Sequence, residues 1–476
     1  MFVGRERELG ELAALWEKTT ASLVTCRGRR RIGKSALINE FAQRTAGRLI
    51  SIEGLPPRKG LSDARQRRHF ADMLSLECGC RIRTGTWLEL FAELDKFIPT
   101  CGRTVVLLDE ISWMGAYNPD FAGYLKIAWD RLWSRHEQLV VVLCGSVSAW
   151  IAENILNNTG FVGRDSLDLE IGELLLSDCM KLLGGRGTRL SVREALDFLA
   201  VTGGIPKYLL ELQTEQSVEE NVRRMCFLPN GLLFREFDEM FSSVFGRRTE
   251  SRGLVLRRLA AGPLSVSELA AVEHVTVSGR LTQMLEDLRY AGFVAKDSGV
   301  NPETGKPYRE VRYRLRDCYV RFYLKYVEPR SASIAQGLYA FAGLDQLPDW
   351  QGMLGLQFET LVLNHIGEIL PRLGLERSLV CSAAPYVQRG KRGEGVQVDL
   401  LIQTKRTLFV VEIKRRANID GGIADELDQK LARLRVPARL SVRTALIYDG
   451  VLSPVIEAEH VFDFVVPVGE LLKVRD

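Results

Sequence analysis

The sequence predicts an α/β protein with more than one domain, and three observations support this prediction. Short, continuous apolar runs at residues 22–28, 104–110 and 139–146 alternate with amphipathic stretches. Such runs are typical of parallel strands that helices cover on both faces. A glycine-rich segment separates the first run from a helical pattern over 34–45. A second apolar hairpin at residues 398–416 indicates a further α/β region near the end of the chain.

Length and composition narrow the class of protein. The chain has 476 residues, 46% of them hydrophobic and 26% charged. We therefore expect a globular protein of about two to four domains. The net charge of +4 does not by itself indicate nucleic-acid binding, although it leaves a local basic groove open. The N-terminus lacks the apolar core of a signal peptide, and no apolar run reaches the ~18 residues of a membrane span.

The nine cysteines are scattered along the chain. Only Cys78 and Cys80 lie close together, and no second Cys or His pair completes a zinc site. We therefore expect reduced, mostly buried thiols in a cytoplasmic protein.

Four regions follow from changes of pattern. Residues 1–165 hold the predicted parallel sheet, and residues 166–250 become helical, which fits a helical lid on that core. Residues 251–330 contain three predicted helices and then a hairpin with an Asn-Pro-Glu-Thr-Gly turn, the pattern of a winged helix-turn-helix. Residues 345–476 are expected to form a last α/β domain.

The segment GRRRIGKS (28–35) fits G-x-x-x-x-G-K-[ST] and stands between a strand and a helix. Gly28 and Gly33 let the backbone fold around phosphates and aim its N–H groups at them. Lys34 is expected on the β- and γ-phosphates, and the Ser35 hydroxyl on Mg²⁺. The alternative is an ordinary glycine-rich turn, which the agreement of motif and context disfavours. The remaining residues expected to contact the nucleotide along this loop are Arg31, Ile32 and Ala36.

An acidic pair ends the second apolar run. Asp109 is expected to hold the Mg²⁺ shell, because it stands at the carboxyl end of a buried strand. Glu110 is expected to polarise the attacking water as general base. Alone, the pair fits a helix N-cap equally well. After the phosphate loop it favours nucleotide hydrolysis.

Five further residues are candidates with open alternatives. Ser146, after the third strand, is expected to orient the water or the γ-phosphate, or else to belong to a Gly-Ser turn. Arg164 is expected to neutralise charge on a γ-phosphate, its own or a neighbour's, or else to be solvated. The segments that hold Gly4, Arg5 and Pro206 are expected to flank the adenine, or else to be structural turns.

These motifs occur in the order and spacing of a known family. FVGRERE, GRRRIGKS, LLDEISWM, LCGSVSAWI and TGGIPKYL together resemble the archaeal-type AAA ATPases, which are related to the signal-transducing STAND P-loop ATPases. The resemblance covers essentially the whole chain. It implies an ATP site with Gly4 and Arg5 on the adenine side, Ser146 at the sensor position and Pro206 in the lid. It also implies a winged helix and a C-terminal region related to PD-(D/E)xK nucleases.

The predicted winged helix has modest DNA-reading features. Its third helix, VSGRLTQMLEDLR, carries Arg280 and Arg289 beside an apolar face. The hairpin is more basic, so phosphate contacts are expected there. The alternative is that the region packs on the lid and senses the nucleotide state. The basic hairpin residues are Lys296, Lys306, Arg309, Arg312 and Arg314.

The hairpin VDLLIQTKRTLFVVEIKRR (398–416) places three charges on strands that otherwise read as buried. The turn geometry puts Asp399 opposite Val411 or Glu412, and Glu412 and Lys414 share a strand face. Two carboxylates so close would repel, and a Mg²⁺ or Mn²⁺ ion would relieve that repulsion. Lys414 would then orient a water or stabilise the transition state. The alternative is a cross-strand salt bridge, worth ~0–1 kcal/mol when exposed.

A third carboxylate is expected from the preceding helix over 351–370, where Glu359 lies near the middle. The set Glu359, Asp399, Glu412 and Lys414 resembles the PD-(D/E)xK nuclease constellation, without the proline that usually precedes the aspartate. Gln429, from a later helix, is a further candidate.

The sequence therefore predicts a P-loop ATPase core with a helical lid, a winged helix-turn-helix and a restriction-endonuclease-like α/β domain. The predicted function is ATP hydrolysis coupled to metal-dependent cleavage of DNA, with ATP and Mg²⁺ as cofactors and Mn²⁺ as an alternative at the nuclease site. DNA is the expected partner, no membrane is involved, and a homo-oligomer is one option. Two alternatives stay open: a nucleotide-switched binding or signalling protein whose nuclease fold does not cut, and a DNA-remodelling ATPase.

Overall fold

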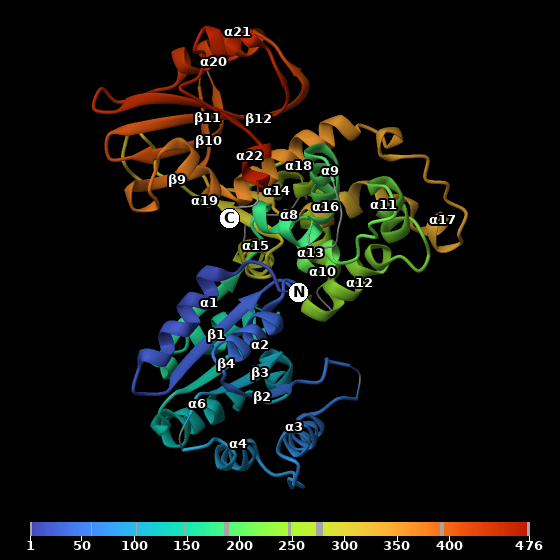
Figure 1. Cartoon of the computed structure of the whole chain (residues 1–476), viewed down its shortest axis with the longest axis vertical. Helices are drawn as coiled ribbons and strands as arrows, with labels where there is room; N and C mark the ends of the chain where they lie inside the picture. The colour runs from blue at the N-terminus through green and yellow to red at the C-terminus, as the bar shows by residue number, and fades with distance from the viewer. Residues whose placement is uncertain are drawn as a thin grey trace. The chain divides into compact units, whose positions relative to one another are not determined.

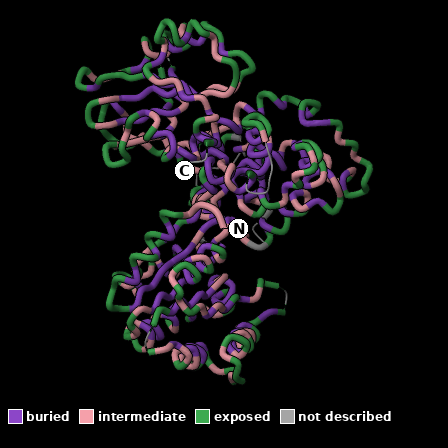
Figure 2. Tube along the Cα trace, in the orientation of Figure 1, coloured by how far each residue is buried: buried purple, intermediate pink, exposed green. Residues whose placement is uncertain are grey.

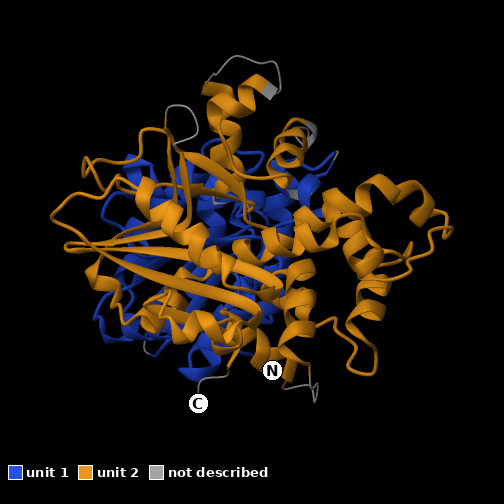
Figure 3. Cartoon of the chain, turned by 90° about the horizontal axis from the view of Figure 1, so that it is seen from above, with its two compact units in different colours: residues 1–174, 238–249, 290–292 blue, residues 175–237, 250–289, 293–476 orange. Residues whose placement is uncertain are grey.

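The computed structural model describes residues 2–58, 60–100, 102–146, 148–184, 190–245, 249–272, 279–390 and 395–473. The chain divides into two compact units, coloured separately in Figure 3. The first unit comprises residues 1–174, 238–249 and 290–292, and the second comprises residues 175–237, 250–289 and 293–476. In the described part of the chain, no helix is long and apolar enough to cross a membrane.

The first unit is built on a five-stranded parallel sheet in the order β2-β3-β4-β1-β5 (Figure 1). The predicted runs coincide with three of these strands, so the parallel α/β core is confirmed. The two edge strands were not predicted: β5 alternates polar and apolar residues, and β2 has four side chains that are not fully buried. The strands are β1 (Ser22–Gly28), β2 (Arg48–Glu53), β3 (Thr104–Asp109), β4 (Leu139–Gly145) and β5 (Asp165–Ile171).

Helices pack against this sheet. Helix α2 contacts β1, β2 and β3, and α3 contacts β2. One core joins Leu23, Val141 and Leu143 of the strands to Phe91 and Trp129 of the helices. The three central strands β1, β3 and β4 are correspondingly almost entirely purple, meaning buried, in Figure 2. The helices of this unit are α1 (Glu6–Ala13), α2 (Lys34–Arg44), α3 (Asp63–Cys78), α4 (Trp87–Lys96), α5 (Ile111–Gly115), α6 (Phe121–Arg131) and α7 (Ser148–Ile151).

The second unit begins with helices, as the sequence predicts. Helices α9 and α11 start with capping boxes, in which Ser191 and Ser217 each exchange hydrogen bonds with a glutamate three residues later. Each box satisfies backbone N–H groups that would otherwise lack a partner. The helices of this part are α8 (Leu176–Gly184), α9 (Val192–Thr202), α10 (Pro206–Leu209), α11 (Val218–Cys226) and α12 (Leu232–Phe245), the last of which extends into residues of the first unit.

Three helices and a small antiparallel sheet follow. The sheet has the order β6-β8-β7, so a short strand that was not predicted joins the expected hairpin. The elements are α13 (Thr249–Ala260), β6 (Leu264–Ser265), α14 (Val266–Val272), α15 (Gly279–Tyr290), β7 (Val294–Asp297) and β8 (Arg312–Leu315). Ser278, the residue expected at the start of the third helix pattern, lies outside the described residues.

The C-terminal part of the second unit holds a mixed five-stranded sheet in the order β13-β12-β11-β10-β9. Strands β9, β10 and β11 pair antiparallel, whereas β11, β12 and β13 pair parallel. Helix α20 provides the crossover that the parallel pair β11 and β12 requires. The strands are β9 (Val380–Gln388), β10 (Val396–Thr404), β11 (Thr407–Ile419), β12 (Ser441–Leu452) and β13 (Phe464–Pro467). The helices of this region and of the stretch before it are α16 (Cys318–Phe322), α17 (Ser331–Ala335), α18 (Trp350–Asn364), α19 (Ile366–Ile369), α20 (Gly422–Arg433), α21 (Pro454–Ala458) and α22 (Gly469–Leu472).

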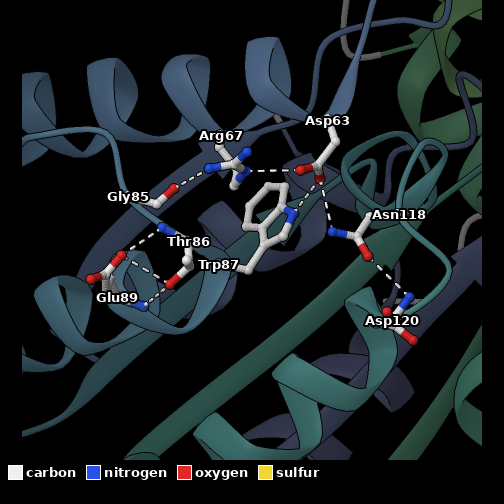
Figure 4. A network of polar contacts seen from close by, with 8 residues as sticks. All are labelled: Asp63, Arg67, Gly85, Thr86, Trp87, Glu89, Asn118 and Asp120. Carbon is white, nitrogen blue, oxygen red and sulfur yellow. Dashed lines mark hydrogen bonds and ion pairs between the residues drawn. The ribbon is translucent and has the colours of Figure 1, made fainter.

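One carboxylate connects α3, α4 and the segment before α6 in the first unit (Figure 4). Asp63 accepts hydrogen bonds from the Trp87 indole at 2.7 Å, from Asn118 at 3.1 Å and from Arg67 at 2.8 Å. Burial would raise the pKa of Asp63, but these hydrogen bonds outweigh it and hold the pKa below its ordinary value. The ionised carboxylate therefore stabilises the folded state.

We predict that Asp63→Ala lowers the free energy of unfolding by about 2 kcal/mol, because it leaves the buried Trp87 N–H without an acceptor. The folded pKa is depressed, so the wild-type contribution is present above the unfolded pKa and is lost as the pH falls through the folded pKa. Urea denaturation followed by tryptophan fluorescence at pH 7 and pH 3 measures both effects. The exposed Asp72 on the same helix is the control, and Asp72→Ala should change stability by less than about 0.5 kcal/mol. Equal effects of both substitutions would contradict the assignment.

Candidate functional site

The glycine-rich loop joins β1 to α2 and bends where only glycine is tolerated. Gly28 has a φ of 151° and Gly33 a φ of 93°. A Cβ atom on Gly28 would lie 2.4 Å from the Ile171 carbonyl oxygen of β5. The loop can therefore lie close against the sheet, with the N-terminus of α2 directly behind it. Unpaired N–H groups at a helix N-terminus attract phosphate, and in this helix they belong to Lys34, Ser35 and Ala36.

The Lys34 side chain is 6% exposed and folds back over the loop. Its ammonium donates hydrogen bonds to the carbonyl oxygens of Gly28 at 3.0 Å and Arg29 at 3.2 Å. The ammonium therefore lies inside the loop that the sequence predicts to bind phosphate. Arg31 has a φ of 68°, and Ile32 is buried at the loop tip.

The structure brings Ser35 and Asp109 together. The Ser35 hydroxyl donates a 2.5 Å hydrogen bond to Asp109 Oδ2, so the helix after the loop touches the carboxyl end of β3. A hydroxyl and a carboxylate in contact are hard oxygen donors of the kind that Mg²⁺ prefers. These residues therefore fit the ion that the sequence analysis assigns to them, with Lys34 beside it for the phosphates.

Glu110 and Ser146 also meet, which the sequence did not indicate. Glu110 Oε2 accepts hydrogen bonds from the Ser146 N–H at 3.1 Å and from the Ser146 hydroxyl at 2.9 Å. Glu110 itself has a left-handed backbone with a φ of 49°, a conformation that is costly for a residue with a side chain. The two residues form one unit at the carboxyl ends of β3 and β4.

A third carboxylate at this edge was missed. Glu53 ends β2 and pairs in register with Asp109 of β3. Burial, Asp109 and Glu110 raise the pKa of Glu53, and Arg30 opposes them. The available signal in the sequence was the position of Glu53 at the end of RLISIE, a segment in which apolar and polar residues alternate.

Arg5 holds the loop from its other side. Its guanidinium donates to the carbonyl oxygens of Gly172 at 2.6 Å, Ile32 at 3.3 Å and Glu173 at 3.4 Å. Gly4 and Arg5 both have left-handed backbones, with φ of 71° and 66°. Arg5 thus connects the phosphate loop to the segment after β5. Its place on the adenine side stays a prediction.

Arg164 lies just before the amino end of β5, at the end of the sheet away from the phosphate loop. It precedes β5, whose first residue pairs with Leu23, whereas the loop end of β1 pairs with the last residue of β5. A strand of this length spans about 20 Å, so Arg164 cannot reach the phosphate loop of its own chain. Its guanidinium binds Asp130 at 2.7 and 3.1 Å and lowers the pKa of that carboxyl to about 2. This position excludes the nucleotide of its own chain and leaves the two other options, contact with a neighbour's nucleotide or a solvated arginine, open.

Pro206 starts helix α10 in the second unit and takes the first helical position, where proline is favoured. Its role at the adenine stays a prediction.

The three charges of the C-terminal hairpin meet where two strands separate. The ladder between β10 and β11 ends with the pair Leu400 and Val411, so Asp399 and Glu412 are the next residues on each strand. A register shift in the pairing of β10 with β9 falls between Val398 and Leu401. Asp399 accepts a 3.0 Å hydrogen bond from the Ile413 N–H. Of the two partners considered for Asp399, the structure therefore selects Glu412.

Two ammonium groups balance these carboxylates. Lys414 lies 3.0 Å from Glu412 and 3.9 Å from both Asp399 and Glu426. Lys430, from α20, donates to the other oxygen of Glu412, whose side chain is 2% exposed. The sequence analysis missed Lys430 and named its neighbour Gln429, which is exposed. The available signal was the α20 sequence, but no local pattern says which of two adjacent residues faces the strand.

Burial shapes the acid–base chemistry of this site. Burial and then Glu412 raise the pKa of Asp399. Burial and then Asp399 raise the pKa of Glu359 to about 7. Burial lowers the pKa of Lys414, but Asp399 and Glu412 outweigh it and raise that pKa. A protein that crowds buried carboxylates in this way favours the binding of a cation.

The donor set for a metal is limited. Asp399 and Glu412 are hard oxygen donors that fit Mg²⁺ or Mn²⁺, and Glu359 lies close enough to influence Asp399. Across the described ranges, however, no cluster of three or more His, Cys, Asp or Glu side chains is arranged to hold a metal ion. A cation at the hairpin would therefore bind Asp399 and Glu412 in place of an ammonium group.

Glu359 also lines a cavity of about 1020 Å³ between the 297–313 hairpin, β6 and β9.

The basic residues of that hairpin region are less available for phosphate contacts than the sequence suggested. Arg314 is buried against Asp297 at 3.0 Å, Arg312 lies 3.1 Å from Glu268, and Lys296 lies 3.3 Å from Glu286. The exposed residues of the set are Lys296, Lys306 and Arg309, and of these Lys296 is paired with Glu286. On α15, Arg289 lies 2.6 Å from Glu286 and Arg280 is exposed.

Several known proteins are similar to this chain in sequence or in structure. No protein-family model matches the sequence. The chain is 21% identical over 420 residues to the uncharacterized protein MJECL04 of Methanocaldococcus jannaschii, a match that covers 87% of each chain. Among solved structures, the Walker-type ATPase PABY2304 of Pyrococcus abyssi is similar with a TM-score of 0.45 and 18% identity, over 68% of this chain and 96% of that chain. The ORC2 protein of Aeropyrum pernix, in its ADPNP–ADP complexes, is similar with a TM-score of 0.41 and 13% identity, over 70% and 95% of the two chains. Cdc6p of Pyrobaculum aerophilum is similar with a TM-score of 0.34 and 15% identity, over 71% and 97%. At these identities and TM-scores the similarities assign no function to this chain.

Proposed function

We propose that the first unit binds and hydrolyses ATP with Mg²⁺. The observation that carries this proposal is the 2.5 Å contact between Ser35 and Asp109, beside Lys34 and a loop that requires Gly28. The loop N–H groups and Lys34 hold the β- and γ-phosphates, and Ser35 and Asp109 hold the ion. The ion supplies charge neutralisation at the phosphates.

Glu110 is the proposed general base. In the structure its carboxylate is engaged by Ser146, so it has to turn from the serine to accept a proton from the attacking water at Oε2. Ser146 then becomes available to donate its hydroxyl hydrogen bond to the γ-phosphate. The exchange makes the Glu110–Ser146 pair a device that keeps the base idle until nucleotide binds.

We expect Lys34→Ala to remove ATP binding, because the buried ammonium lies inside the loop, where the β- and γ-phosphates would contact it directly. Glu110→Gln should retain ATP binding and slow turnover by about 10²-fold or more, since the amide cannot accept the proton. Equilibrium binding of a fluorescent ATP analogue and release of inorganic phosphate measure the two steps.

Glu93→Gln, a surface carboxylate on α4 in contact with Lys96, is the matched control and should leave both steps unchanged. Full turnover by Glu110→Gln would show that Glu110 is not the base. Undetectable ATP binding by the wild type would contradict the proposal itself.

We further propose that the C-terminal sheet carries a metal-dependent nuclease site that acts on DNA. The supporting observation is the pair Asp399 and Glu412 at the point where β10 and β11 separate, with Lys414 3.0 Å from Glu412. Asp399 and Glu412 would hold the cation, which would polarise the scissile phosphate, and Glu359 would lie beside Asp399. Lys414 would orient the attacking water or stabilise charge on the phosphate. This is the residue set of the PD-(D/E)xK resemblance.

The elements from α13 to β8 would then serve as a winged helix that engages DNA. Arg280 on α15 and the hairpin residues Lys306 and Arg309 are exposed and are the proposed phosphate contacts. Arg164 acting on a neighbour's nucleotide would require a homo-oligomer. The described cysteines are free, which is consistent with a reducing cytoplasm.

Cleavage of linear DNA with Mn²⁺, with and without ATP, tests the nuclease. We expect Asp399→Asn to lower the cleavage rate by at least about 10²-fold, because it removes a ligand of the cation. Glu426→Gln alters another carboxylate 3.9 Å from Lys414, but one that is 47% exposed, and should cut at close to the wild-type rate. If the wild type cuts neither DNA nor RNA, the hairpin charges serve a non-cleaving binding site, and the nucleotide switch is the function that remains.

A further inference from the structure

Arg415 directly follows Lys414 on β11, and its guanidinium lies between two carboxylates. It contacts Asp197 of α9 at 2.7 Å and Asp449 of β12 at 3.0 Å, and its side chain is 9% exposed. Successive side chains on a strand point to opposite faces, so Lys414 and Arg415 project to opposite sides of the sheet. Whatever holds Arg415 therefore also sets where the Lys414 backbone lies.

The backbone pairing alone fixes this part of β11 poorly. The parallel ladder between β11 and β12 is regular up to Arg415 and Asp449, and its register then shifts before Asn418. At Gly450 a Cβ atom would lie 1.8 Å from the Arg416 carbonyl oxygen, so the two strands are crowded at the irregularity. The ion pairs of Arg415 lie at the last regular position, where the ladder ceases to determine the strand.

The same helix α9 supports the other wall of the candidate nuclease site. Gln357, two residues before Glu359 on α18, is fully buried. Its amide nitrogen donates to the Ala200 carbonyl oxygen of α9 at 2.7 Å and to the Cys318 carbonyl oxygen at 2.8 Å. Its amide oxygen accepts a 2.5 Å hydrogen bond from the buried Arg321. Ala200 and Asp197 are three residues apart, so they lie on one face of α9.

We propose that Asp197 is a positioning residue for the nuclease site: through Arg415 it sets the place of Lys414, and its helix α9 also holds Gln357 on the helix that carries Glu359. The inference rests on the proposed nuclease function. Asp197 and Ala200 of α9 thereby hold the two sides of the site, Lys414 through Arg415 and Glu359 through Gln357.

Asp197 and Asp449 make matched variants, because each removes one carboxylate from the same guanidinium. Asp449→Asn leaves the link to α9, whereas Asp197→Asn removes it and leaves Arg415 bound to its neighbouring strand. The proposal predicts that Asp197→Asn lowers the Mn²⁺-dependent cleavage rate about tenfold with an unchanged KM for DNA, while Asp449→Asn stays within about twofold of wild type. Asp197→Glu should restore most of the lost rate. Equal losses in both asparagine variants would overturn the proposal.

A second readout does not depend on cleavage. Amide hydrogen exchange of peptides covering 411–416 is compared in the full chain among wild type, Asp197→Asn and Asp449→Asn. We expect faster exchange in Asp197→Asn than in the other two proteins. Unchanged exchange in Asp197→Asn would contradict the positioning role. Faster exchange in Asp197→Asn together with no cleavage by wild type would leave that role standing and count against the nuclease proposal alone.

Discussion

Charge placed at the ends of buried strands has to be balanced inside the protein, and both candidate sites are built around that constraint. A buried charge without a partner is costly enough to unfold a domain of ordinary stability. Lys34 therefore rests on carbonyl oxygens of its own loop, and Glu412 is held by two ammonium groups. These contacts keep the metal-free and nucleotide-free protein folded. They are also the contacts that phosphate or a divalent cation would replace.

The two sites share a design but differ in what ligand binding has to displace. In the first unit, nucleotide would release Lys34 from the loop and Glu110 from Ser146, so under the proposed function binding and activation of the base would be one event. In the C-terminal sheet, a cation would take a place now held by an ammonium group, and α9 supports the residues on both sides of it.

Local patterns were sufficient for residues close in sequence and insufficient for partners far away. The loop from Gly28 to Ser35 and the strands of the first sheet follow from spacing and continuous apolar runs. The edge strands β2 and β5 were not predicted, because strands with exposed residues do not form a continuous apolar run. Lys430 and Asp197 escaped for another reason: they reach the C-terminal site from helices 18 and 218 positions away from their partners. The availability of the basic hairpin residues for DNA was overestimated, because their carboxylate partners could not be recognised from the sequence. Arg312 pairs with Glu268 of α14, and Arg314 pairs with Asp297 of the neighbouring strand β7.

The most direct test of the account is calorimetric titration of Mn²⁺ into the nucleotide-free protein. Wild type should bind one ion that Asp399→Asn does not bind, because Asp399 and Glu412 together form the donor pair. Lys430→Met should bind that ion more tightly than wild type, since no ammonium then competes for Glu412. Identical isotherms for wild type and Asp399→Asn would contradict the account, and the charges at the end of the hairpin would then be a structural ion-pair network.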